Sequence, residues 1–138
     1  MNYRLLAVFA LIVGGIAFSA PSRVFSENGS EDPTLVQAAI CENIQDLTPQ
    51  NRGIAFSVAI GKVLCFTSFD PVPKEAIVYN NWFHRDKPST KIRLTLKPPR
   101  WSTFSSIKLR QADKGPWRVE ITDQDGNILR ILRFSITD

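Results

Sequence analysis

The feature that most constrains the fold is the stretch Trp117–Ile136, which joins two runs of alternating apolar and polar residues by a short turn sequence. In an extended chain, alternate side chains point to opposite faces, so each run has one face suited to a core and one suited to water. The intervening sequence DQDGN contains an Asp-Gly pair, which favours the positive φ of a tight hairpin turn. We therefore predict a β-hairpin here, with a bulge near Arg130 or Ile131, where apolar residues are adjacent.

Short strands separated by turn sequences account for most of the remaining chain. The predicted strands are Lys62–Phe69, Ala76–His84, Lys91–Lys97 and Trp101–Leu109. Two earlier segments, Leu35–Ile44 and Phe56–Ile60, are ambiguous by composition. The sequence LTPQNRG is predicted as a turn and RDKPST as a loop, and Pro98-Pro99 should end the strand before it. About seven short strands at this spacing predict an all-β fold, a single immunoglobulin-like antiparallel β-sandwich over residues 34–138.

The N-terminal residues 1–26 are predicted to be a signal peptide and leader, followed by a flexible linker at 27–33. Arg4 precedes an apolar run at 5–18, which is short for a membrane span of about 20 residues. Cleavage is expected after Ser19 or Ser26. The alternative is an uncleaved segment that anchors the protein to the inner membrane. Either way, the domain is expected outside the cytoplasm, in the periplasm or extracellular space.

The charge of the chain is unevenly placed. The formal net charge is +4 over 138 residues, and from Arg85 onward Lys and Arg outnumber Asp and Glu about two to one. One interpretation is a solvated sheet face. The other is a patch for an anionic partner such as an envelope polymer, a lipid headgroup or an acidic protein. Nucleic acid is not expected as a partner, because export removes the usual targets.

The two cysteines, Cys41 and Cys65, both lie in the part expected to be exported. An even count in an oxidising compartment favours a disulfide, so we predict a structural bridge between them. The alternatives are two free thiols in the core or a redox-active pair. The spacing is wrong for the latter, which normally has the pattern C-x-x-C.

The sequence shows no catalytic apparatus. His84 is the only histidine, so a Ser–His–Asp arrangement or most zinc sites would have to use it, yet no serine lies in a nucleophile-elbow pattern. DQDGN resembles the opening of a calcium loop, but the closing glutamate is missing. We therefore predict no catalytic residue, no metal site and no cofactor.

Aromatic and basic side chains supply the candidate binding residues. Trp117 alternates with Val119 and is expected in the core, whereas an exposed Trp101 near Arg100 and Lys108 could stack on a sugar or hold a partner. The full set of candidate binding residues is Trp82, His84, Arg100, Trp101 and Lys108.

The stretch from Ala38 to the end resembles the bacterial domain-of-unknown-function family numbered 2914. The matching pieces include AAICENI, IVYNNWFHRDK and GPWRVEITDQDGNIL, in the order that the family shows. Its most specific pattern is G-x-W-x-V-x-V/I-x-D-x-x-G-x-x-L, formed here by Gly115, Trp117, Val119, Ile121, Asp123, Gly126 and Leu129. Asn80 stands where the family often has a histidine, two residues before Trp82. The resemblance implies a compact β-sandwich of the cell envelope with a pair of cysteines, and it implies no activity.

Together these observations predict an exported, non-enzymatic binding or interaction module of the bacterial cell envelope. Its expected partner is an unknown envelope protein or an anionic or carbohydrate polymer, with membrane contact only through the N-terminal segment if that segment is uncleaved. A structural accessory subunit of a membrane complex is the first alternative, and it predicts a contiguous exposed apolar patch. A hydrolase relying on His84 is the second, and it predicts a serine or carboxylate within hydrogen-bond reach of that ring.

Overall fold

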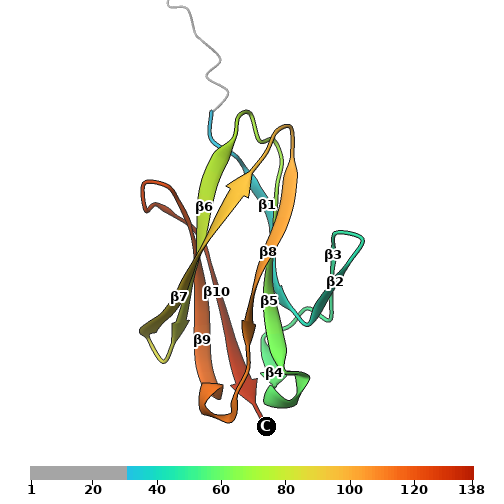
Figure 1. Ribbon diagram of the computed structural model, residues 1–138, viewed down its shortest axis with the longest axis vertical. Coiled ribbons are helices and arrows are strands. Elements are labelled where there is room, and N and C mark those ends of the chain that lie inside the picture. The colour runs from blue at the N-terminus through green and yellow to red at the C-terminus, as the bar shows by residue number, and fades with distance from the viewer. Residues whose placement is uncertain (1–30) are drawn as a thin grey trace, which may run out of the picture.

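The protein is a sandwich of two β-sheets in a computed structural model that describes residues 31–138 (Figure 1). The smaller sheet has the order β1-β5-β8, formed by Leu35–Cys41, Lys62–Phe69 and Trp101–Lys108. The larger sheet has the order β4-β10-β9-β6-β7, formed by Ala55–Ser57, Ile128–Thr137, Gly115–Asp123, Ala76–His84 and Lys87–Leu96. The predicted β-sandwich is confirmed. Strands β1, β5, β6, β7, β8, β9 and β10 each have seven or more residues, in agreement with the predicted seven.

The smaller elements lie between the long strands. A hairpin of β2 (Asn43–Gln45) and β3 (Thr48–Gln50) projects beside the smaller sheet (Figure 1), and short 3₁₀ turns follow β4 and β8, at Val58–Ile60 and Gln111–Asp113. The predicted turn over LTPQNRG is interrupted by a strand: the chain turns at Asp46 and Leu47, forms β3, and leaves that strand at Asn51, whose φ is 53°.

The predicted signal peptide, its cleavage sites and most of the linker lie outside the described residues. Within residues 31–138, no helix has the length and apolar character that crossing a membrane requires.

The hairpin predicted from the C-terminal pattern is present as β9 and β10. Phe134 pairs with Trp117 and Leu132 with Val119, so the predicted apolar positions share one face. Gly126 has a φ of 86°, which an L-residue rarely adopts, and this closes the turn. The register shifts between Ile128 and Arg130, next to the predicted bulge.

The turn between β6 and β7 is tighter than predicted. Arg85 and Asp86 both have positive φ values, 51° and 63°, so two residues without glycine make the connection. Strand β7 therefore begins at Lys87, not Lys91, and includes most of the predicted loop RDKPST. Pro88 is tolerated there because β7 is at the edge of its sheet.

The main core fills the space between the two sheets. Its buried aromatic side chains are Phe56, Phe69, Trp82, Trp117 and Phe134. Trp82 is only 1% exposed, and its indole N–H donates to the Ser105 hydroxyl, 3.1 Å away, which also accepts from the Asn80 amide at 2.7 Å. A buried Trp on the third long strand is typical of immunoglobulin-like sandwiches. Trp82 is thus a structural residue, and its prediction as a binding residue is wrong.

The predicted disulfide is absent, and the strand register explains why. Ile40 pairs with Cys65, and Cys41 pairs with Leu64. Paired residues share a face of the sheet, so Cys65 points into the main core while Cys41 points outward into a second cluster with Leu64 and Phe66. Both thiols are free and buried.

The two thiols should therefore be unreactive until the protein unfolds. Burial raises the pKa of Cys65 to about 12 and also raises that of Cys41. Since the thiolate is the reactive form, iodoacetamide should label neither residue in native protein at pH 8 and both in urea without reductant. Mass spectrometry of the labelled chain measures this, and failure to label either residue in urea would instead indicate a bridge.

Trp82 and Trp101 should differ sharply in their contribution to stability. We expect Trp82→Ala to lower the free energy of unfolding by about 3–5 kcal/mol, because it leaves a cavity and removes one of the two hydrogen bonds that the Ser105 hydroxyl accepts. Trp101, which is 36% exposed, is the matched control, and its replacement by Ala should cost less than about 2 kcal/mol. Urea titrations of both variants measure the difference, and equal midpoints would contradict this assignment.

Candidate functional site

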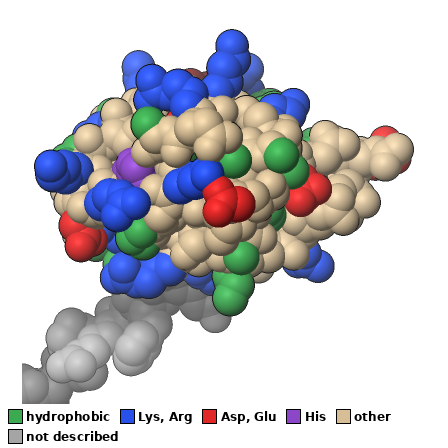
Figure 2. Space-filling model, turned by 90° about the horizontal axis from the view of Figure 1, so that it is seen from below, with side chains coloured by type: hydrophobic (Ala, Val, Ile, Leu, Met, Phe, Trp, Pro, Cys, Tyr) green, Lys and Arg blue, Asp and Glu red, His purple; other side chains and the backbone are tan. Residues whose placement is uncertain are grey.

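One end of the sandwich gathers basic side chains from several elements. The start of β5, the β6–β7 turn and the segment from β8 to β9 all meet there. We call this surface the basic end; its Lys and Arg residues are Lys62, Arg85, Lys87, Lys108, Arg110 and Lys114. Figure 2 looks onto the molecule from this side and shows Lys and Arg side chains spread widely over it, with fewer acidic side chains between them.

The most unusual feature of the basic end is a pair of like charges. Lys62 and Lys108 lie directly opposite each other in the antiparallel β5–β8 ladder, and both are exposed. Like charges at opposed positions repel and destabilise the sheet. No ion pair of either lysine is found within residues 31–138.

The aspartates of this end are already paired with other bases. Asp113 binds Arg110, Asp138 binds Lys114, and Asp86 binds Arg118 of β9. These pairs leave Lys62, Arg85, Lys87 and Lys108 without an ion pair among the described residues. The basic end therefore carries uncompensated positive charge.

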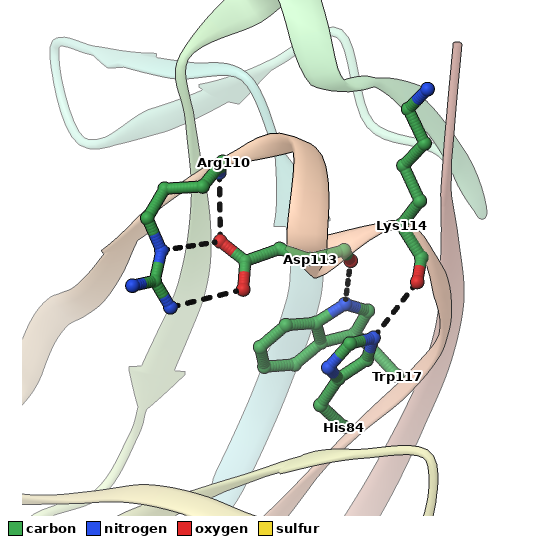
Figure 3. Close-up of polar contacts among 5 residues, drawn as sticks. All are labelled: His84, Arg110, Asp113, Lys114 and Trp117. Carbon is green, nitrogen blue, oxygen red and sulfur yellow. Dashed lines mark hydrogen bonds and ion pairs between the residues drawn. The ribbon is translucent and has the colours of Figure 1, made fainter.

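A rigid aromatic framework supports the basic end (Figure 3). The His84 ring stacks on Trp117, with ring centroids 4.4 Å apart and planes 14° from parallel. The Trp117 indole N–H donates to the Asp113 carbonyl at 2.7 Å, and His84 Nε2 donates to the Lys114 carbonyl at 2.9 Å. These contacts tie β6 and β9 to the 3₁₀ turn that precedes β9.

Asp113 closes that turn. Its carboxylate accepts from the Arg110 main-chain N–H at 2.7 Å and from the Arg110 guanidinium. Burial alone would raise the pKa of Asp113, but these hydrogen bonds and the Arg110 charge outweigh it and hold the pKa below its ordinary value. The carboxylate thus stabilises the turn while it is ionised.

The family pattern belongs to this framework. Gly115 has a φ of 116°, and a Cβ there would lie 2.8 Å from the Arg85 guanidinium. Arg85 donates to the Lys114 carbonyl at 3.1 Å, so its side chain lies across the glycine. In the turn after β9, Asp123 accepts the main-chain N–H groups of Asp125 and Asn127. The pattern therefore encodes structural positions.

Among the described residues, no serine hydroxyl or carboxylate is hydrogen-bonded to His84. A hydrolase requires a serine hydroxyl or a carboxylate within hydrogen-bond reach of the imidazole. The hydrogen bond found for His84 instead goes to a main-chain carbonyl, and Trp117 covers one face of the ring. Within residues 31–138, no group of three or more His, Cys, Asp or Glu side chains could hold a metal ion.

The structure divides the predicted binding residues between the two ends of the sandwich. His84 and Lys108 lie at the basic end. Arg100 and Trp101 lie at the opposite end, beside a hollow of about 550 Å³ that Val36 and Leu47 also line. Leu47, at the tip of the β2–β3 hairpin, is 68% exposed. Its lining combines three exposed apolar side chains with polar and charged ones, namely Val36, Leu47 and Trp101 with Ser68, Asp70, Arg100 and Ser102.

Sequence reasoning missed Lys62, Arg85 and Lys87. Arg85 and Lys87 were assigned to an ordinary charged loop, and Lys62 was treated only as the first residue of a strand. The sequence contains one indication for Lys62. If the predicted strands Lys62–Phe69 and Trp101–Leu109 pair in the observed register, Lys62 lies opposite Lys108. That register depends on tertiary structure, so the strand pattern alone does not reveal it.

Comparisons with known proteins found a family match over part of the chain. Residues 75–136 match the family described as Protein of unknown function (DUF2914). The family resemblance is confirmed over this part of the chain. Residues 38–74, which the resemblance also included, lie outside the DUF2914 match. A search of curated proteins found no match.

Among solved structures, a beta-glucosidase from Kluyveromyces marxianus is similar over 78% of this chain, with 10% sequence identity and a TM-score of 0.42. This chain spans 14% of the length of that enzyme. A likeness at this level carries no argument about activity.

The Asp113 turn gives a pH-dependent prediction. The pKa of Asp113 in the folded protein lies below its value of about 3.9 in the unfolded chain. The stabilisation by the ionised Asp113 carboxylate is therefore fully present above about pH 3.9 and is lost as the pH falls through the folded pKa. Asp113→Asn should lower the free energy of unfolding at pH 7 by about 1–3 kcal/mol. The difference from wild type should shrink below about pH 3.5. Urea titrations from pH 2.5 to pH 7 would disprove this if the difference were constant.

Proposed function

We propose that this protein is an exported, non-enzymatic binding module of the bacterial cell envelope, and that its basic end binds an anionic partner. The observation that carries the proposal is the opposed pair Lys62 and Lys108. A sheet gains nothing from like charges at such positions, and a bound anion would convert their repulsion into attraction.

The surroundings of the pair support the same function. The three aspartates of the basic end are bound to other bases, so an incoming anion does not compete with a resident carboxylate at Lys62 or Lys108. The His84–Trp117 stack and the Asp113 turn hold the adjoining segment in place. A site on such a framework loses little conformational entropy on binding.

Export is proposed from the sequence of the N-terminus, with its basic residue Arg4 and the apolar run at 5–18. Fractionation of cells that produce the full chain, followed by N-terminal sequencing, tests it. Mature protein in the periplasm or medium that begins after Ser19 or Ser26 is the expected result. Full-length protein in the cytoplasm would refute export.

The structural accessory subunit is the second candidate function. The hollow lined by Val36, Leu47 and Trp101 favours it, because these side chains expose apolar surface together. Substitutions at Leu47 would affect this function, whereas substitutions at Lys62 would affect the first.

Lys62→Glu should weaken anion binding and leave the fold intact. We expect the dissociation constant for polyglutamate, or for vesicles containing phosphatidylglycerol, to rise at least roughly fivefold at low salt. The same change should raise the free energy of unfolding by roughly 0.2–1 kcal/mol, because it places opposite charges across the strands. Titration and urea unfolding measure the two effects on one sample.

Arg130→Glu is the matched control, because it makes the same change in net charge at an exposed position of β10 that lies away from the basic end. It should reduce binding less than Lys62→Glu. Equal losses for the two variants would show that net charge alone, without a site, accounts for binding.

A further inference from the structure

Within residues 31–138, β8 is the one long edge strand of the sandwich without an evident device against pairing. Edge strands carry unpaired main-chain groups, and proteins protect them with charges, bulges, short length or a covering segment. Strand β7 carries exposed Lys87, Lys91 and Arg93, and β4 has three residues. Strand β1 has a register shift between Leu35 and Gln37, and its Ile40 carbonyl accepts from Gly53.

Strand β8 has none of these features. Its sequence WSTFSSIK contains no proline, and its only charge is at the last residue. Its register with β5 is continuous from Trp101 to Lys108. Phe104, in the middle of the strand, is 52% exposed. Such an edge is suited to accept a further strand.

The ladder identifies the main-chain groups that face the open side. The Leu109 N–H donates to the Gly61 carbonyl at 2.9 Å, so this pair is hydrogen-bonded in the antiparallel pattern. Hydrogen-bonded pairs alternate, which directs the main-chain groups of Trp101, Thr103, Ser105 and Ile107 toward β5. The N–H and C=O groups of Ser102, Phe104, Ser106 and Lys108 therefore point away from β5, toward the open edge of the sheet.

The charges around β8 define the chemistry of the incoming strand. Lys97 and Arg100 precede its first residue, and Lys108 ends it opposite Lys62. A second copy of this chain paired antiparallel in the register that opposes Phe104 to Phe104 would bring Arg100 against Lys108 of its partner. A strand with carboxylates at its ends and uncharged residues in its middle matches the pattern better.

We infer that β8 binds an extended acidic segment of another protein by β-strand addition. This rests on the proposed anion binding at the basic end and names the partner class. The incoming main chain exchanges hydrogen bonds with Phe104 and Ser106, and one terminal carboxylate lies beside Lys108. An apolar side chain near the start of β8 can enter the hollow between Trp101 and Leu47.

A synthetic peptide of about eight residues serves as the probe, with alternating Val and Thr and with Glu at both ends. Titration calorimetry with the full chain should show binding, and amide hydrogens of Phe104 and Ser106 should exchange more slowly with the peptide bound. The same peptide with Lys at both ends should bind at least roughly tenfold more weakly. Unchanged exchange at both amides under saturating peptide would overturn strand addition.

Ser106→Pro tests the main-chain contact directly. It removes an N–H that points to the open edge, so the β5–β8 ladder keeps its hydrogen bonds. We expect at least roughly tenfold weaker peptide binding, whereas Ser106→Ala, which keeps the N–H, should bind within about twofold of wild type. Equal peptide affinity of the two variants would overturn the proposal, and the exchange measurement on wild type decides if Ser106→Pro does not fold.

The two proposals fail in different ways. If Ser106→Pro binds both peptide and polyglutamate like wild type, while Lys62→Glu loses both, strand addition is wrong and anion binding stands. If Lys62→Glu binds every anionic probe like wild type, the proposed function of the basic end is wrong.

Discussion

The fold depends on the burial of one face of the β9–β10 hairpin against the rest of the core. Trp117 and Val119 of β9 lie opposite Phe134 and Leu132 of β10, and Trp82 of β6 lies opposite Val119. The Phe134 ring packs edge-on against Trp82 and is stacked with Trp117. This aromatic group joins three adjacent strands of the larger sheet and belongs to the buried core between the two sheets, where large apolar side chains contribute most to stability.

The sequence was sufficient to predict this part of the structure because the information is local. Alternation of apolar and polar residues defines both faces of a strand, and Pro98-Pro99 or an Asp-Gly pair defines where strands end. The predicted bounds Lys62–Phe69 and Ala76–His84 are the same as those of β5 and β6. The β6–β7 turn was missed because Arg85 and Asp86 adopt positive φ without glycine, a choice that the surrounding structure imposes.

Non-local information decided the remaining features. Cys41 and Cys65 satisfy every compositional criterion for a disulfide, yet a register that pairs Ile40 with Cys65 puts the two thiols on opposite faces of one sheet. Ile44 of the β2–β3 hairpin covers part of the outer face of β1, so side chains on both faces of this strand are buried. The apolar–polar alternation of β1 therefore does not show which face points to the core. Lys62 and Lys108 likewise become neighbours only through the β5–β8 register.

Some residues are needed for the fold and others remain free to bind a partner, and this difference limits where a binding site can lie. The residues of the family pattern have structural roles: Gly115 leaves room for the Arg85 side chain, Trp117 is buried, and Asp123 closes a turn. Substituting such residues would disturb the sandwich before it disturbed any ligand. A binding role must therefore rest on groups that the fold leaves unsatisfied. Lys62 at the start of β5, Lys108 at the end of β8 and the open main-chain groups of β8 are such groups, and they adjoin one another. One partner that is both extended and acidic could satisfy both at once, which no compact anion could do.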